Sequence, residues 1–380
     1  MSRTIPPFRA DQVGSLLRPL ELKQARAQFQ ARAINAEQLK IVEDKAILDL
    51  IAKQEAVGLK AVTDGEFRRE FWHFDFLGGL DGVELYESGA GIKFKGADTK
   101  PKSVHVVGKI GYTSHPMIEH FKFLRDHAHQ TPKMMIPSPG VLHFRGGRAA
   151  VPESIYPSME GFYDDLGNAY QEAVRAFADA GCRYLQLDDT PFAYFCDVEQ
   201  RKMLKDRGDD PDQLPRIYAK MINTAISTIP ADMRITMHLC RGNFKSLWIG
   251  QGGYEPIAEL LFNEVNVDGY FLEYDTDRAG GFEPLRFVPK GKTVVLGLVT
   301  SKTGLLESQD GLKRRIDEAA QFIDLDQLCL SPQCGFASTE EGNLLSEDQQ
   351  WAKLERIVET ADEVWGKSNP STNGSQILAA

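Results

Sequence analysis

A histidine and a cysteine two positions apart end a strongly β-like run in the second half of the chain. The run is RITMHLC (234–240), and it contains His238 and Cys240. Because side chains alternate between the two faces of a strand, residues i and i+2 point the same way. An imidazole and a thiolate are donors that Zn²⁺ prefers. The spacing therefore predicts half of a zinc site.

Two further metal donors stand at the ends of later strand-like runs. Glu273 lies in FLEYD and Cys334 in SPQCG. Taken singly, such residues are also explained as core or hydrogen-bonded side chains. Together, four donors spread over about a hundred residues favour a reactive site over a compact zinc finger. A thiol substrate entering a thiolate-rich zinc shell would be deprotonated, so the predicted chemistry is sulfur alkylation.

The other three cysteines are interpreted differently. Cys182 begins a strand-like run, Cys196 lies beyond one, and Cys329 lies inside one. We assign all three as core or incidental thiols. An odd total of five cysteines predicts reduced thiols and no disulfide framework.

A second polar group ends three other strand-like runs. Ser15 lies in VGS, Glu66 in TDGE and Asp188 in LDD. The two carboxylates suit the ammonium of an amino acid, and Ser15 or nearby N–H groups suit its carboxylate. DGE and LDD would equally serve as helix caps. We expect these residues to bind the amino-acid part of the substrate.

The elements that position these residues alternate along the chain. Eight β-rich runs cover 12–16, 61–66, 133–140, 182–189, 234–240, 268–275, 293–301 and 327–334. Apolar residues recur with helical spacing in 34–57, 159–180, 213–228, 309–323 and 346–365. Strand followed by helix, repeated eight times, predicts an α/β fold of the (β/α)8 TIM barrel type. Active sites of such barrels lie at the carboxyl ends of the strands, where the predicted site residues stand.

Length and local composition define the predicted domain. A chain of 380 residues allows one large barrel or two ordinary domains. The uninterrupted repeat favours a single catalytic barrel over residues 1–366. The Gly-rich stretch 79–113 predicts a β-hairpin inserted after the second strand, and 367–380 predicts a flexible tail.

Charge and hydropathy narrow the class of partner. A net charge of −10 argues against nucleic-acid binding as the main role. The sequence has neither an apolar leader nor a run of about 18 apolar residues, so we expect a cytoplasmic protein that does not span a membrane. Small molecules are the predicted partners.

These motifs resemble the catalytic barrel of the cobalamin-independent methionine synthase family, especially its short single-barrel members. HLC, LEYD and PQCG match the family's zinc ligands, and VGS, TDGE and QLDD match residues that hold homocysteine. The resemblance covers almost the whole chain. It implies a zinc-dependent methyltransferase that activates homocysteine as a thiolate and converts it to methionine, with 5-methyltetrahydrofolate as the methyl donor.

Three departures from the family pattern leave the general acid and the donor open. PSPGVLHFRGG (137–147) lacks the Trp that stacks the pterin, and Tyr194 stands near an acidic folate contact of the family. Thr300 occupies the place of the proton-donating His. The catalytic acid is therefore unassigned, and His143, Tyr194 and His73 are the candidates.

Alternatives to this function are few. A related zinc reaction opens epoxides with coenzyme M, whose sulfonate would need a cation such as Arg18 or Arg145. The carboxylates Glu66 and Asp188 favour the amino acid instead. Methylcobalamin is an alternative donor, and a zinc-holding sensor or chaperone is the non-enzymatic alternative.

Overall fold

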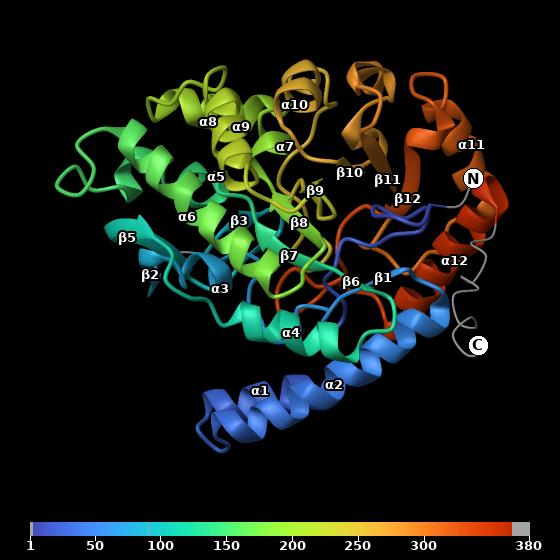
Figure 1. Ribbon diagram of the computed structural model, residues 1–380, viewed down its shortest axis with the longest axis horizontal. Helices are drawn as coiled ribbons and strands as arrows, with labels where there is room; N and C mark the ends of the chain where they lie inside the picture. Colours follow the sequence, from blue (N-terminus) through green and yellow to red (C-terminus); the bar gives the residue numbers. More distant parts are fainter. Residues whose placement is uncertain (1–2, 90, 367–380) are drawn as a thin grey trace, which may run out of the picture.

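The structure, a computed structural model, describes residues 3–89 and 91–366. Its centre is a six-stranded parallel sheet with the strand order β12-β11-β10-β9-β8-β7 (Figure 1). The strands are β7 (Met134–Pro137), β8 (Tyr184–Asp189), β9 (Arg234–Leu239), β10 (Gly269–Glu273), β11 (Thr293–Val299) and β12 (Leu328–Pro332). Each lies inside a predicted strand-like run, so six of the eight runs are confirmed as strands.

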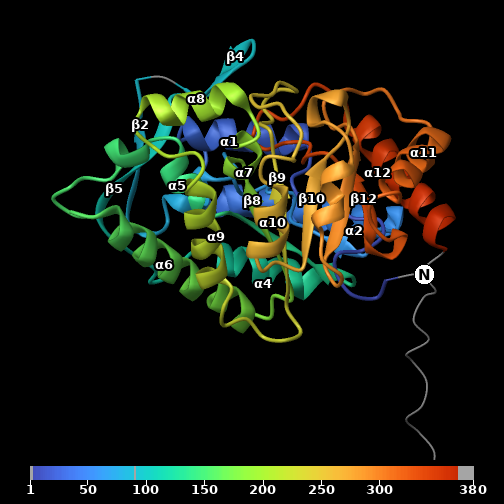
Figure 2. The same ribbon diagram turned by 90° about the horizontal axis from the view of Figure 1, so that it is seen from above.

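Helices surround this sheet in both views (Figures 1 and 2). The predicted helices are confirmed as α2 (Ala36–Val57), α6 (Met159–Asp179), α9 (Leu214–Ala225), α11 (Gln309–Ala319) and α12 (Glu347–Trp365). Further helices are α1 (Leu20–Gln30), α3 (Phe74–Leu77), α4 (Met117–His127), α5 (Gly140–Phe144), α7 (Pro191–Tyr194), α8 (Val198–Asp206) and α10 (Ala258–Glu264). Short 3₁₀ turns are η1 (Gly147–Ala150), η2 (Asp277–Ala279), η3 (Glu283–Phe287) and η4 (Leu325–Gln327). No helix in the described ranges is long and apolar enough to cross a membrane.

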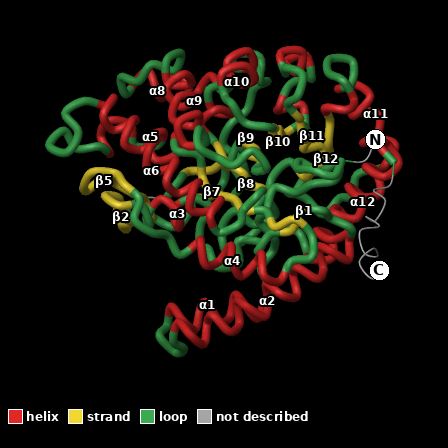
Figure 3. Tube along the Cα trace, in the orientation of Figure 1, coloured by secondary structure: helices red, strands yellow, loops and turns green. Residues whose placement is uncertain are grey.

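The first two predicted strands differ from expectation. The run 61–66 is reduced to β1 (Ala61–Val62), which pairs in parallel with β6 (Thr131–Pro132) as a separate two-stranded sheet (Figure 3). The prediction of a strand over 12–16 is wrong, although Ala10 forms a parallel bridge with Leu330. Positive φ values at Gly14 (138°) and Glu66 (61°) take both segments out of the extended conformation.

Residues 79–113 contain two antiparallel pairs. β2 (Asp81–Glu87) pairs with β5 (Lys102–Gly111), and β3 (Lys93–Phe94) pairs with β4 (Ala97–Asp98). Neither pair joins the central sheet. β4 stands out from the body of the molecule when viewed from above (Figure 2).

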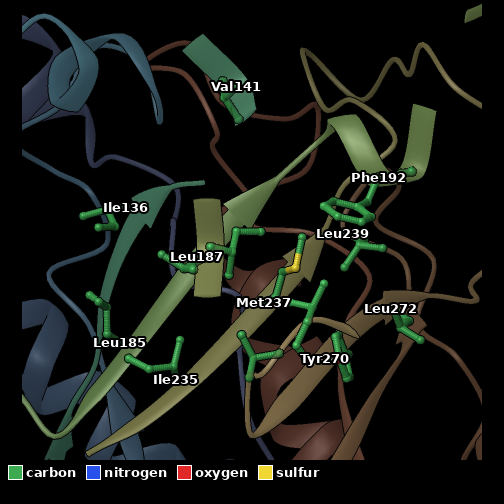
Figure 4. Packing of buried hydrophobic residues seen from close by; sticks show 14 of the residues in the cluster. Ile136, Val141, Leu185, Leu187, Phe192, Ile235, Met237, Leu239, Tyr270 and Leu272 are labelled. Carbon is green, nitrogen blue, oxygen red and sulfur yellow. Dashed lines mark hydrogen bonds between the residues drawn. The ribbon is translucent and has the colours of Figure 1, made fainter. Parts of the chain in front are cut away.

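The two faces of the central sheet carry different side chains. Leu187, Met237 and Leu239 pack in a large apolar cluster that also contains side chains of α6 and α9 (Figure 4). The alternate residues Asp188 and His238 face the other way and are aligned with each other in the register of β8 and β9. The sheet thus separates a core under the helices from an inner face that carries polar side chains beside a small apolar cluster of Phe271, Val295 and Cys329.

Candidate metal and substrate site

Three of the four predicted metal donors meet at the carboxyl ends of β9 and β12. Cys240 Sγ lies 3.0 Å from Cys334 Sγ, and Cys334 Sγ lies 3.5 Å from His238 Nε2. The donor atoms of these residues all lie within 4.8 Å of one another. Strand alternation brings His238 and Cys240 to the same face, and the curvature of the sheet brings Cys334 to them.

The fourth predicted donor, Glu273, lies beside this cluster with its carboxylate engaged by other groups. Glu273 Oε1 is 3.6 Å from Cys334 Sγ and accepts a 2.7 Å hydrogen bond from the Arg241 N–H. Its Oε2 pairs with the Arg278 guanidinium at 3.0 Å. Glu273 is fully buried, so this carboxylate is positioned next to the donors but is shared with a cation.

The electrostatics of the cluster favour one thiolate and one charged imidazole. Hydrogen bonding from Cys334 lowers the pKa of Cys240 to about 5, although burial opposes this. Burial and the Cys240 thiolate raise the pKa of Cys334 well above its usual value. Burial opposes charge on His238, but the neighbouring thiolate and carboxylates raise its pKa overall. Two sulfurs, an imidazole and a nearby carboxylate form a donor set that fits Zn²⁺.

The predicted substrate residues share one cavity with two of the metal donors. Ser15, Glu66, Asp188, His238 and Cys240 all line it. Cys334 and Glu273 lie behind this lining and are buried. The structure therefore brings the two predicted groups together around one cavity.

Glu66 and Asp188 are buried carboxyl groups with raised pKa values. Burial raises the pKa of Glu66 to about 7, against the opposing charge of Arg69, whose Nη1 lies 3.4 Å from Glu66 Oε1. Burial raises the pKa of Asp188 to about 6, and Gln186 Nε2 donates to Asp188 Oδ1 at 2.7 Å. A cationic ligand beside either carboxylate would stabilise its charged form and so offset the hydration lost on burial.

Glu66 has a left-handed backbone conformation, with a φ of 61°, and contacts from neighbouring segments hold it there. The Arg18 guanidinium donates to the carbonyl oxygens of Glu66, Arg69, Ala337 and Thr339. Arg18 thus fixes the segments after β1 and β12 and does not line the cavity. Gly335 permits a close approach there, because a Cβ at this position would lie 2.0 Å from Ser15 Oγ.

The structure separates the expected candidates for the proton donor. Thr300 and His143 do not line the cavity, and His143 lies between the hydroxyls of Tyr218 (2.7 Å) and Tyr163 (3.2 Å). Tyr194 and His73 do line it. Burial lowers the pKa of His73 well below its usual value, so this imidazole is neutral at pH 7.

Several lining residues carried no signal in the sequence. Trp72, Asn243, Ile92 and Phe94 reach the cavity from loops and from β3. No motif or periodicity marks these positions, because loop geometry places them. The aromatic run FWHF at 71–74 was the nearest available signal.

Comparison with known proteins decides the family. Residues 8–362 match the family model described as the catalytic domain of cobalamin-independent synthase. The chain belongs to this family. It is therefore a member of the cobalamin-independent methionine synthase-like methyltransferases, as the motifs of the metal and substrate groups predicted.

Individual relatives of this family member cover almost all of both chains. It is 53% identical over 361 residues to the uncharacterized protein YxjH of Bacillus subtilis, covering 94% of this chain and 95% of that protein. It is 21% identical over 366 residues to the methionine synthase of Pyrococcus abyssi, covering 96% of each chain. A Listeria monocytogenes crystal structure, described as a candidate vitamin-B12-independent methionine synthase, is similar with a TM-score of 0.78 and 42% identity. It covers 96% of this chain and 100% of that chain.

Proposed function

We propose that the protein is a zinc-dependent methyltransferase that converts homocysteine to methionine, with 5-methyltetrahydrofolate as the methyl donor. The observation that carries the proposal is the convergence of His238, Cys240 and Cys334 beside a cavity that also contains Glu66 and Asp188. A similar chain of matching length from Pyrococcus abyssi is named methionine synthase, which supports this activity for a chain of this size.

The proposed metal ligands are His238, Cys240, Cys334 and Glu273. Zn²⁺ bound there would lower the pKa of a substrate thiol, so that the thiolate is populated at neutral pH. Arg278 and the Arg241 N–H orient the Glu273 carboxylate and limit its donation. Glu273 is accordingly the weakest ligand of the set.

The proposed amino-acid ligands are Ser15, Glu66 and Asp188. Glu66 and Asp188 bind the substrate ammonium once ionised, and Ser15 with nearby backbone N–H groups binds its carboxylate. The substrate sulfur then forms a bond to the methyl carbon while the bond from that carbon to the donor nitrogen breaks. The leaving nitrogen takes a proton, for which His73 and Tyr194 are the polar groups that line the cavity.

The proposed fold is a closed barrel formed by one domain over residues 1–366. Leu330 N donates to Arg9 O at 2.8 Å, which joins the amino-terminal segment to β12. Lys133 N donates to Val62 O at 2.8 Å, and Leu16 N donates to Gly65 O at 3.1 Å. We assign 79–113 as an insertion after the second barrel strand, while the predicted tail 367–380 lies outside the described residues.

A donor panel tests the function. Purified protein loaded with zinc is incubated with homocysteine and, in turn, 5-methyltetrahydrofolate with one or three glutamates, methylcobalamin and S-methylmethionine. Methionine is measured by mass spectrometry, and coenzyme M replaces homocysteine in a control series. Methionine from the folate supports the proposal, whereas no turnover with any donor would overturn it.

A further inference from the structure

Two buried polar side chains, Asn243 and Lys302, join the loops that carry the two sulfur donors. Asn243 stands three residues after Cys240. Its Nδ2 donates at 2.8 Å to the carbonyl oxygen of Gly335, which directly follows Cys334. Lys302 lies in the loop after β11, and its Nζ donates at 3.2 Å to Asn243 Oδ1. A hydrogen-bonded bridge therefore links the loops after β9, β11 and β12.

The loop after β11 also contacts the residue on the other side of Cys334. The backbone N–H and the hydroxyl of Ser301 donate to Gln333 Oε1 at 2.6 and 3.0 Å. Both chain neighbours of Cys334, Gln333 and Gly335, are thus hydrogen-bonded from outside their own loop. Groups that hold the neighbours of a metal ligand determine where its donor atom lies. The contacts of this loop therefore fix the position of the Cys334 sulfur.

Lys302 brings a buried positive charge to this bridge. The residue is 8% exposed. Its two acceptors, Asn243 Oδ1 and the Gly242 carbonyl oxygen, are both uncharged, and within the described ranges Lys302 forms no ion pair. Buried charges in proteins are normally paired, so we expect an anionic group to lie close to this ammonium.

The metal donors provide that negative charge. The Lys302 ammonium acts electrostatically on Asp275 and on Cys334. Asp275 is already shared with another cation, because its Oδ1 lies 3.7 Å from the Arg278 guanidinium. Zn²⁺ held by two thiolates, a carboxylate and a neutral imidazole would carry one net negative charge, which a nearby ammonium stabilises. The charge and position of Lys302 therefore suit the metal-bound state.

We propose that Lys302 and Asn243 are positioning residues for the metal site. The bridge sets the separation of the two sulfur donors, and the ammonium stabilises them when both bind Zn²⁺ as thiolates. This inference rests on the proposed function and deepens it, because it names residues that act through the metal ligands. Neither residue belongs to the cluster of donor atoms. Their role also differs from that of Arg278, which pairs with the Glu273 carboxylate.

Metal binding without any substrate tests this role. Zinc affinity is measured by competition with a chromophoric chelator in wild type, Lys302→Met, Lys302→Arg and Asn243→Asp. Cobalt replaces zinc in a second series, in which the sulfur-to-cobalt charge-transfer band per bound cobalt reports how many thiolates bind the metal. Lys292→Met is the matched control, because it removes an ammonium that donates to the Phe262 and Val265 carbonyl oxygens just before β11. Circular dichroism checks that each variant is folded.

We expect Lys302→Met and Asn243→Asp to weaken zinc binding by about 10- to 100-fold, the range for groups that orient metal ligands. Lys302→Arg keeps the charge and should lose less affinity than Lys302→Met. The cobalt band should fall in Lys302→Met even at saturating cobalt, whereas Lys292→Met should match wild type in both measurements. Wild-type zinc affinity and cobalt band in folded Lys302→Met and Asn243→Asp would overturn the proposal. Equal losses in Lys302→Arg and Lys302→Met would overturn the role of the charge.

Failure of this inference and failure of the proposed function give different results. Methionine formation by the wild-type protein, with equal zinc affinity in wild type and Lys302→Met, would support the function and contradict the positioning role. Zinc binding that depends on Lys302, with no methionine from any donor, would support the positioning role and contradict the function.

Discussion

Cys240 and Cys334 are 94 residues apart in the chain, yet their sulfur atoms lie 3.0 Å apart. Their strands, β9 and β12, are separated in the sheet by β10 and β11. Three strand spacings in a flat sheet amount to roughly 14 Å, so the contact requires strong curvature. The metal donors therefore face the concave side of the sheet, which is the arrangement that a closed barrel provides.

The two thiols should be required for metal binding. We expect Cys240→Ala and Cys334→Ala to lose zinc and activity, because each removes one of only two sulfur donors in the cluster. Metal content is measured by inductively coupled plasma mass spectrometry. Cys329→Ala is the matched control, since this buried thiol lies outside the cluster and should retain zinc. Stoichiometric zinc in the Cys240/Cys334 double variant would contradict the metal assignment.

Glu273 should contribute less to zinc affinity than the thiols. Its carboxylate already pairs with Arg278, so Glu273→Gln should weaken zinc binding by about 10- to 100-fold while leaving a measurable site. Competition with a chromophoric chelator gives the affinity. Complete loss of zinc, equal to that of the cysteine variants, would show that Glu273 is a principal ligand.

The thiol substrate should bind better as Glu66 ionises. With a pKa of about 7, this carboxyl is protonated at pH 6 and cannot pair with an ammonium. We expect kcat/KM for homocysteine to rise with pH through about 7. Glu66→Gln should remove this rise and lower kcat/KM at pH 8 by about 10- to 100-fold, the range for a lost charged hydrogen bond. A pH profile that is the same in both proteins would contradict the role of Glu66.

The same carboxyl should reduce the stability of the metal-free fold at high pH. Its pKa is raised from 4.5 to about 7 on folding, so the native state binds the proton more tightly than the unfolded state. The free energy of unfolding must therefore fall as the pH rises from about 4.5 to 7, and Glu66→Gln avoids this loss. Urea unfolding at pH 8 should show the variant more stable by up to about 3 kcal/mol. Equal or lower stability would show that Glu66 is already ionised at little cost.

Substitutions at two neighbouring residues of β9 should affect fold stability and metal binding separately. Met237 packs in the apolar cluster (Figure 4). His238 instead lines the cavity. Met237→Ala should lower the free energy of unfolding by about 2–5 kcal/mol and keep zinc, and His238→Ala should lose zinc. Thermal unfolding and metal analysis distinguish them. Loss of zinc in a folded Met237→Ala would contradict the alternation of the two faces.

The helices and strands could be predicted because the spacing of apolar residues along the chain indicates which side chains are buried. The helical spacing of 34–57 predicted α2, and the capping box of Asn35 and Gln38 fixes its first turn as found. The H-x-C spacing likewise predicted that His238 and Cys240 share a face. Segment 12–16 was mistaken for a strand because its apolar residues are buried, while Gly14 has a φ of 138° that no apolar pattern shows.

The sequence offered His73 and Arg145 as possible site residues, but it could not place the segments that carry them. Arg145 and His73 line the cavity although no spacing relates them to the strands they follow. The segment before His73 is held by tertiary contacts such as those of Arg18 with the Glu66 and Arg69 carbonyl oxygens, and Arg145 directly follows the short helix α5. His143 looked equally suitable as an acid in the sequence, but hydroxyls of two tyrosines engage it outside the lining.

X-ray absorption at the zinc edge would show directly whether a substrate thiol binds the metal held by His238, Cys240 and Cys334. Zinc-loaded protein is measured alone and after addition of homocysteine, with serine as a control of similar charge. We expect two sulfur ligands, from Cys240 and Cys334, in the free protein and three when homocysteine is bound. An unchanged sulfur count at saturating homocysteine would contradict activation of the substrate thiol at this site.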